Sequence, residues 1–197
     1  MSRLFALLCA ITCAVALTVA CSAPPQKEID RAQQAVDAAK AAGADQYAPE
    51  SFTEATTALQ QSHEAVNQRD YRLALSRAVD ASDRAQEAAR AAAENKAKAR
   101  SQAEAAVNAV NALVMHLQAR LKVAEEVRVP SRELAPARAT LKESEGALQK
   151  ARALLAAENY AAAIQAVSGS DSQIRSETRV VEAAITLRTA RRPAKKR

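Results

Sequence analysis

A stretch of 59 residues, 71–129, contains neither glycine nor proline, and its length constrains the fold more than any other feature. The stretch is rich in alanine and in Glu, Gln, Arg and Lys, which have high helix propensity. At about 1.5 Å per residue, one continuous helix here would extend roughly 90 Å, whereas a globule of this size is only about 40 Å across. The sequence therefore predicts either a broken helix or an elongated molecule.

Apolar and small residues recur at steps of three and four along the chain, the pattern of helices packed in a coiled-coil-like bundle. The five seams are Ile29, Ala32, Val36 and Ala39; Phe52, Ala55, Leu59, Ser62 and Val66; Tyr71, Ala74, Ala78, Ala81, Ala85, Ala88 and Ala92, continued by Val107, Val110, Val114, Leu117, Leu121 and Ala124; Leu134, Leu141, Leu148 and Leu155; and Tyr160, Ala163, Val167, Ile174, Val181 and Ala184. Residues 94–100, between the two parts of the third seam, lack large apolar residues and are the expected site of a waist or bend. The leucines spaced by seven fit either a core or a dimer seam.

An internal repeat organises the chain. Two pairs of segments match: 58–75 with 147–164 at an offset of 89 positions, and 47–49 with 134–136 at an offset of 87. Each copy is expected to contain a helix that starts at a proline, a tight corner and a returning helix. Asp70 and Asn159 are expected to cap the returning helices.

These patterns predict an all-α fold of elongated antiparallel helical bundles, or coiled coil, in which two three-helix units share one long central helix. The first bundle is expected over residues 26–95 and the second over residues 96–190. The expected helices lie near 26–42, 49–69 and 71–95 in the first bundle and, after the rest of the long helix, near 136–157 and 160–189 in the second.

The first twenty residues have the layout of an export signal. Arg3 is their only charged residue, and an uninterrupted run of apolar and small residues extends from Leu4 to Ala20. This run is at the short end for a membrane-spanning helix and fits the middle and end of a cleavable signal peptide. We therefore predict a signal peptide over residues 1–20, followed by a stiff, proline-containing tether over residues 21–25.

The segment Thr18-Val19-Ala20-Cys21 resembles the lipobox of bacterial lipoproteins. It departs from that pattern at Thr18, where leucine is usual, and Leu17 lies one residue too early. The resemblance implies cleavage before Cys21, a diacylglycerol on its thiol and palmitate-type acylation, which would anchor the protein to a membrane facing the periplasm. Because Ser22 is not the aspartate that retains lipoproteins in the inner membrane of enteric bacteria, the outer membrane is favoured. A plain secretory signal and an uncleaved anchor are the alternatives.

Three further segments carry a family resemblance: 29–32, 42–50 and 70–74. They are similar to bacterial envelope lipoproteins with the domain of unknown function 4398, and the similarity covers roughly residues 25–105. Its motifs are alanine-rich. The resemblance implies a helical domain in the cell envelope and brings no established activity with it.

Residue types that carry catalysis or bind metals are sparse. His63 and His116, the only histidines, lie on separate expected helices, and neither has Cys, Asp or Glu at metal-ligand spacing on both sides. The sequence contains no glycine-rich phosphate loop, Gly-x-Ser-x-Gly elbow or HExxH motif. We therefore expect no catalytic residues, no cofactor, no metal site and no enzymatic activity.

Positive charge is concentrated in the last ten residues. The formal net charge is +6, and residues 188–197 hold six basic residues and no acidic one. We expect residues 191–197 to form a disordered basic tail, whose charges are Arg191, Arg192, Lys195, Lys196 and Arg197. Behind an export signal, the polyanions available to such a tail are phospholipid and lipopolysaccharide head groups and the cell wall rather than nucleic acid, and each basic residue contributes about 1 kcal/mol to such a contact. We expect the cell wall or an anionic envelope polymer as the partner. A purely solubilising tail is the alternative.

These expectations favour a non-enzymatic, membrane-anchored cell-envelope lipoprotein that acts as a structural or scaffolding rod. The alternative is a periplasmic binding module, such as a chaperone or assembly accessory, in which a groove between helical hairpins holds a peptide or protein partner. Such a groove would expose an apolar patch on the order of several hundred Å², whereas a rod would not.

Overall fold

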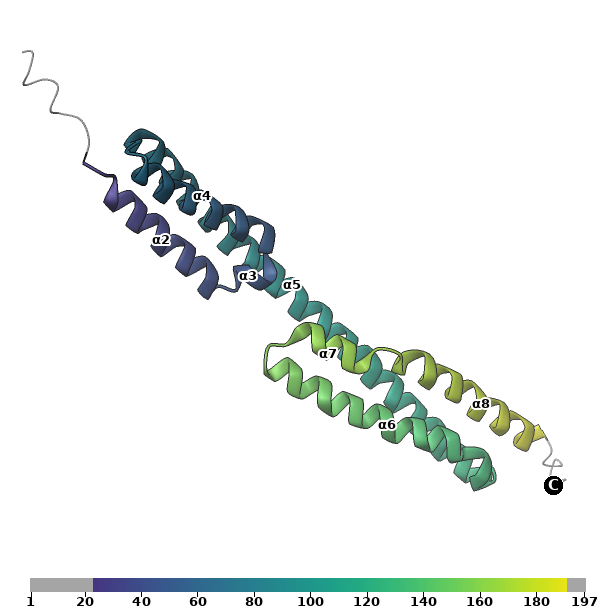
Figure 1. Ribbon diagram of the computed structural model, residues 1–197. Coiled ribbons are helices and arrows are strands. Elements are labelled where there is room, and N and C mark those ends of the chain that lie inside the picture. Colours follow the sequence, from purple (N-terminus) through teal and green to yellow (C-terminus); the bar gives the residue numbers. More distant parts are fainter. Residues whose placement is uncertain (1–22, 191–197) are drawn as a thin grey trace, which may run out of the picture. The chain divides into compact units, whose positions relative to one another are not determined.

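The computed structural model describes residues 23–190, and this part of the chain is helical without strands. The helices are α2 (Gln26–Ala41), α3 (Ala44–Tyr47), α4 (Pro49–Asn67), α5 (Tyr71–Glu126), α6 (Ser131–Ala156), α7 (Tyr160–Val167) and α8 (Ser170–Ala190) (Figure 1). The predicted all-α fold with one long central helix is confirmed. Helix α5 runs without interruption for 56 residues, so the stretch 94–100 does not break it.

The chain divides between Asn95 and Lys96 into two compact units. The first contains α2, α3, α4 and the beginning of α5, and the second contains the rest of α5 with α6, α7 and α8 (Figure 1). Helix α5 contributes buried residues to a separate core in each unit. In the first unit one stretch of α5 therefore packs with α2, α3 and α4, and in the second another stretch packs with α6, α7 and α8.

The core of the first unit is built largely from alanine. The predicted seam of α5 is fully buried at Ala74, Ala78, Ala81, Ala85, Ala88 and Ala92. It packs with Ile29, Ala32, Val36 and Ala39 of α2 and with Ala55, Ala58 and Leu59 of α4. Small side chains allow neighbouring helices to approach closely, so this unit is held by helix-to-helix contact rather than by bulky residues. The hydroxyl of the fully buried Ser62 donates to the carbonyl of Ala74 at 2.8 Å, which satisfies it.

The core of the second unit uses larger side chains. Its buried members include Val107, Val110, Val114, Leu117 and Leu121 of α5, Leu134 and Leu148 of α6, Val167 of α7, and Ile174, Val181 and Ile185 of α8. Leu134 and Leu148 are almost completely buried within the chain itself. These two leucines therefore fit a core seam rather than a dimer seam.

Helices α4, α5 and α6 end in the same type of corner. Arg69, Arg128 and Glu158 adopt left-handed backbone conformations, with φ of 61°, 61° and 57°. At each corner the next amide donates to a carbonyl five residues back, as Asp70 does to Ala65 at 2.9 Å. This pairing is the Schellman motif, which satisfies carbonyls at a helix end and reverses the chain.

The two predicted caps are confirmed. The Asp70 carboxylate accepts a hydrogen bond from the Leu73 amide at 3.0 Å, and the Asn159 side chain accepts one from the Ala162 amide at 3.2 Å. Each bond satisfies an amide in the first turn that has no partner within its helix. The repeated corner is thus built by the same chemistry in both units.

The prediction that both repeat copies contain a helix starting at a proline is wrong for the second copy. Pro49 is the first residue of α4, but α6 starts at Ser131 and contains Pro136 in its interior. A proline disfavours helical geometry in the residue before it, and Ala48 is indeed non-helical, with φ of −144°. In the second copy Leu134 and Ala137 both face the core at helical spacing, so their burial overrides this preference.

The expected single helix over 160–189 is also wrong, because α7 ends at Val167 and α8 begins at Ser170. Gly169 lies between them with φ of 83°, a conformation that side chains rarely adopt. Val167 and Ile174 remain in one core across this break. The short helix α3 was not predicted either; it follows Gly43, which also has a positive φ of 82°.

Because Pro136 is exposed and lies inside α6, replacing it should restore a helical hydrogen bond without loss of packing. We expect Pro136→Ala to raise the free energy of unfolding by about 1–2 kcal/mol, since the restored helix outweighs the extra freedom of the unfolded chain. Pro49→Ala is the matched control: its missing amide falls at a position that has no helical partner, so it should give no gain. Urea unfolding followed by circular dichroism measures both, and equal effects would contradict this account.

Candidate functional site

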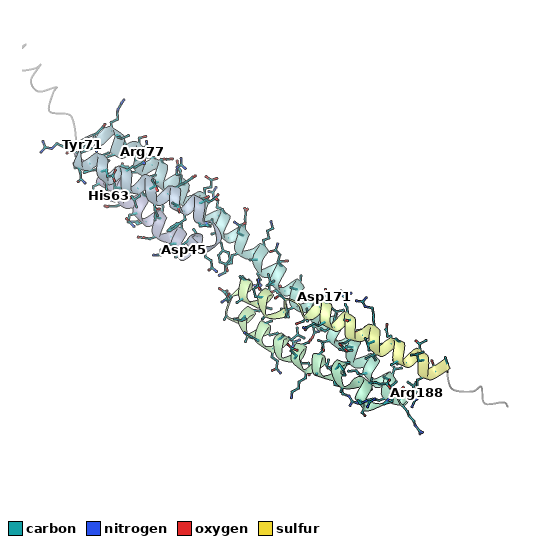
Figure 2. All side chains as sticks on the ribbon, turned by 45° about the vertical axis from the view of Figure 1, so that its right-hand side comes forward. Asp45, His63, Tyr71, Arg77, Asp171 and Arg188 are labelled. Atoms are coloured by element: carbon teal, nitrogen blue, oxygen red, sulfur yellow. The ribbon has the colours of Figure 1, made fainter. Side chains whose placement is uncertain are left out.

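Most of the residues assigned a role from the sequence lie outside the described part of the chain. These are Cys21, Arg191, Arg192, Lys195, Lys196 and Arg197. His63 and His116 are exposed on α4 and α5 and belong to different units (His63 is labelled in Figure 2). Within residues 23–190, no group of three His, Cys, Asp or Glu side chains is arranged to hold a metal ion.

None of the helices between residues 23 and 190 is both long enough and apolar enough to span a bilayer.

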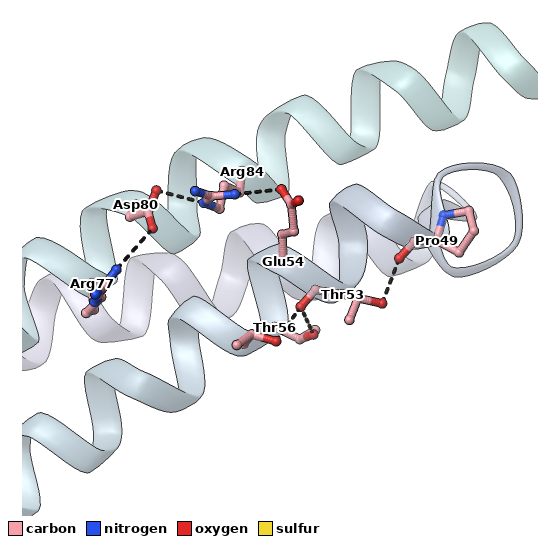
Figure 3. Close-up of polar contacts among 8 residues, drawn as sticks. Pro49, Thr53, Glu54, Thr56, Arg77, Asp80 and Arg84 are labelled. Carbon is pink, nitrogen blue, oxygen red and sulfur yellow. Dashed lines mark hydrogen bonds and ion pairs between the residues drawn. The ribbon is translucent and has the colours of Figure 1, made fainter.

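The most developed polar constellation lies in an open groove between α4 and α5, with a volume of about 290 Å³. Helix α4 lines it with Thr53, Glu54, Thr57, Ala58 and Gln61, and α5 lines it with Arg77, Asp80 and Arg84. Figure 3 shows the charged side chains reaching toward one another along α5 and across to α4. The charges of the groove are balanced, with two arginines and two carboxylates.

Arg84 is the centre of this constellation. Its Nη1 lies 2.6 Å from Glu54 Oε2 on α4, and its Nε lies 2.8 Å from Asp80 Oδ1 on α5 (Figure 3). Arg77 Nη1 is 3.9 Å from the other oxygen of Asp80. The hydrogen bond that Arg84 donates to Asp80, followed by the negative charge of Asp80 and that of Glu54, holds the pKa of Arg84 above its ordinary value. The Arg84 guanidinium on α5 therefore links α5 to α4 through its ion pair with Glu54.

The threonines of this groove have their hydroxyl donors in use. Thr53 donates to the Pro49 carbonyl at 2.7 Å, and Thr57 donates to the Thr53 carbonyl at 2.8 Å (Figure 3). Both bonds lie within α4. Because the hydroxyls bond to their own helix and the ions bond to each other, these residues present neither an unbalanced charge nor an activated nucleophile. The arrangement serves to join two helices.

A second groove, of about 260 Å³, lies between α5 and α6 in the other unit. Arg152 donates across it to Asn111 at 2.8 Å, and Gln118 donates across it to Glu145 at 2.6 Å. Met115 lies at its edge and is 62% exposed. The polar contacts again link two helices, with one exposed thioether beside them.

The corner between α6 and α7 is fixed to α5 by charge. Lys96 Nζ lies 2.7 Å from Glu158 Oε2. The hydrogen bond and charge of Lys96, with a smaller contribution from Arg100, hold the pKa of Glu158 below its ordinary value of 4.5. Glu158 is also the residue with the left-handed backbone at this corner, so the ion pair anchors the turn itself.

Sequence reasoning did not single out these cross-helix pairs. Asp80 and Arg84 are four residues apart, a spacing that indicates a pair on one helix face. Glu54 lies 30 positions before Arg84, and nothing local in the sequence joins them. Comparison with protein-family models, with curated proteins and with solved structures finds no match to this chain.

We expect Lys96→Met to raise the pKa of Glu158 toward its ordinary value, because the hydrogen bond and positive charge that stabilise the carboxylate are removed. A lowered pKa in the folded state stabilises the fold above the unfolded pKa, and this contribution is lost as pH falls through the folded pKa. The variant should therefore lose less stability than the native chain as the pH drops below about 4.5. An NMR titration of the Glu158 carboxyl carbon measures the shift. Lys98→Met, which removes an exposed charge two residues away, is the control and should leave the titration unchanged.

Proposed function

We propose that this protein is a non-enzymatic cell-envelope lipoprotein, anchored by lipid at Cys21, whose helical units act as a structural scaffold. The observation that carries the proposal is the run Leu17-Thr18-Val19-Ala20-Cys21 directly after an apolar segment with a single charge. Small residues before a cysteine at this place are typical of lipoprotein processing. We further propose that residues 25–105 form a helical domain of the kind found in envelope lipoproteins with the domain of unknown function 4398, which implies the same cell-envelope location, with the outer membrane favoured.

The chemistry of the described helices supports a structural role. The groove between α4 and α5 contains an ion cluster around Arg84 whose charges pair with one another. The groove of the second unit is crossed by Arg152–Asn111 and Gln118–Glu145 hydrogen bonds. Polar residues in both grooves thus connect helices, which is what a scaffold requires of its surface contacts.

Attachment to the envelope has a second expected component in the basic residues 191–197. A single acyl chain gives marginal membrane binding, and stable anchoring combines two signals, such as several acyl chains or one chain with a basic segment. Five basic residues among seven are suited to contact an anionic component of the envelope. The proposed scaffold is therefore held by covalent lipid and, in addition, by charge.

The alternative function, a binding module, is favoured by one observation. Met115 is exposed at the edge of the groove between α5 and α6, and flexible methionines are common on surfaces that accept varied partners. A partner would have to enter between the two hydrogen-bonded pairs that cross this groove. We therefore rank this function second.

The proposal predicts that Cys21→Ser abolishes incorporation of labelled palmitate, because the thiol is the atom that accepts the lipid. The precursor should then stay uncleaved or the protein should be released from the membrane. Cys9→Ser and Cys13→Ser are matched controls, since both cysteines lie in the segment that is removed, and labelling should persist in them. Labelling that survives Cys21→Ser would disprove the anchor.

A further inference from the structure

The last three turns of α8 expose an uncharged face. Val180 is 54% exposed and Leu187 is 61% exposed, although both are large apolar residues. Ala183 and Ala190 are exposed beside them. The residues that α8 contributes to the core, such as Val181 and Ile185, lie on a different side of the helix. The outer face is therefore an additional apolar stripe, not the edge of the core.

Two threonine hydroxyls in the last turns of α8 are already hydrogen-bonded. The Thr186 hydroxyl donates to the Glu182 carbonyl at 2.9 Å, and the Thr189 hydroxyl donates to the Ile185 carbonyl at 3.1 Å. Because both hydroxyl donors bond to carbonyls of the same helix, they do not need water as a hydrogen-bond partner. Thr186 therefore brings no unpaired hydroxyl donor to the exposed side of α8, and Thr189 lies toward the core side, four residues after the buried Ile185.

The charged residues of these turns are engaged inside the second unit. Glu182 Oε1 lies 3.3 Å from Arg120 Nε on α5. Arg188, labelled near the end of α8 in Figure 2, donates through Nε to the Arg128 carbonyl at 3.2 Å. Both contacts are directed toward α5 and the corner that follows it, and they leave the stripe between Val180 and Leu187 without a charge.

The stripe is followed directly by the basic residues. Residues 179–197 contain seven basic residues and one acidic residue, Glu182, which is a net charge of +6. The whole chain also has a formal net charge of +6, so the other 178 residues hold 21 basic and 21 acidic side chains and are neutral. All of the net positive charge therefore lies within and immediately after the turns that expose the apolar stripe.

We propose that the exposed apolar face at this end of α8 docks on the surface of an anionic phospholipid bilayer. An apolar helix face combined with basic residues is the pattern of helices that lie in a membrane interface, where apolar side chains enter the acyl boundary and cations contact head groups. An anionic polymer would engage the charges but offers no apolar phase for Val180 and Leu187. Pairing with a second copy through the same stripe would bring segments of like charge together.

This inference names the partner of the charged attachment in the proposed function but does not depend on lipidation of Cys21. It is tested on a chain that begins at Ser22, which keeps all residues of both cores because these lie between Ile29 and Ile185. The probe is co-sedimentation with phosphatidylcholine vesicles that contain about one-third phosphatidylglycerol, compared with pure phosphatidylcholine. Failure here would leave the palmitate labelling of Cys21 unaffected, so the two proposals are tested separately.

We expect binding to the anionic vesicles only, and a reduction in affinity of about tenfold or more in Val180→Ser/Leu187→Ser. The matched control is Leu75→Ser/Val79→Ser on α5, where the two side chains are 40% and 48% exposed but no basic segment follows. The control should bind like the unmodified chain. Circular dichroism checks that helix content is retained in both variants, which is expected because all four residues are exposed.

The chain contains no tryptophan, so a single introduced indole reports on its own surroundings. Leu187→Trp should show blue-shifted fluorescence when anionic vesicles are added, whereas Val79→Trp should not. Equal binding of the Val180→Ser/Leu187→Ser variant, or an unshifted Leu187→Trp spectrum, would overturn the proposal and leave attachment by charge alone. Binding to isolated cell wall without binding to vesicles would overturn it as well.

Discussion

Helix α5 contributes buried residues to two separate cores. The rest of the structure depends on this helix staying continuous between them. Its first buried seam is entirely alanine from Ala74 to Ala92, and its second, from Val107, consists mainly of valine and leucine. Between them, residues 93–102 contribute nothing to either core. Their helicity comes from high-propensity residues and from helix already formed on both sides, which removes the cost of nucleation. Within this stretch the adjacent residues Asn95 and Lys96 contact different units: Asn95 donates to the Tyr47 carbonyl in the first, and Lys96 pairs with Glu158 in the second.

Periodicity predicted the buried faces well because helical spacing alone decides which residues share a side. The six α5 residues Val107, Val110, Val114, Leu117, Leu121 and Ala124 are all buried as predicted. Helix ends were predicted less well, because they reflect a balance between local preference and packing. At Pro136 the burial of Leu134 and Ala137 continues the helix through a residue that would ordinarily begin one. At Gly169 the left-handed conformation ends α7 although the apolar spacing continues across it.

The polar contacts were less accessible from the sequence. Pairs at a spacing of four, such as Asp80 with Arg84, are visible in one helix. The contacts that fasten one helix to another join residues far apart in the chain, as Glu54 with Arg84 and Lys96 with Glu158 do, and they depend on how helices are placed in three dimensions. The exposed face of α8 could be noticed only once the structure had shown which side of that helix enters the core. The proposed lipidation of Cys21, by contrast, rests on sequence alone, because the lipobox-like pattern is one contiguous local segment.

Helix α5 remains one helix where neither core supports it. Backbone chemical shifts of residues 93–102, measured by NMR on the chain that begins at Ser22, test this most directly. We expect helical Cα shifts at each of these residues, continuous with those of Ala92 and Ala103. Shifts near random-coil values at residues 95–100 would show that the helix is interrupted there, and the two units would then each end in a separate helix.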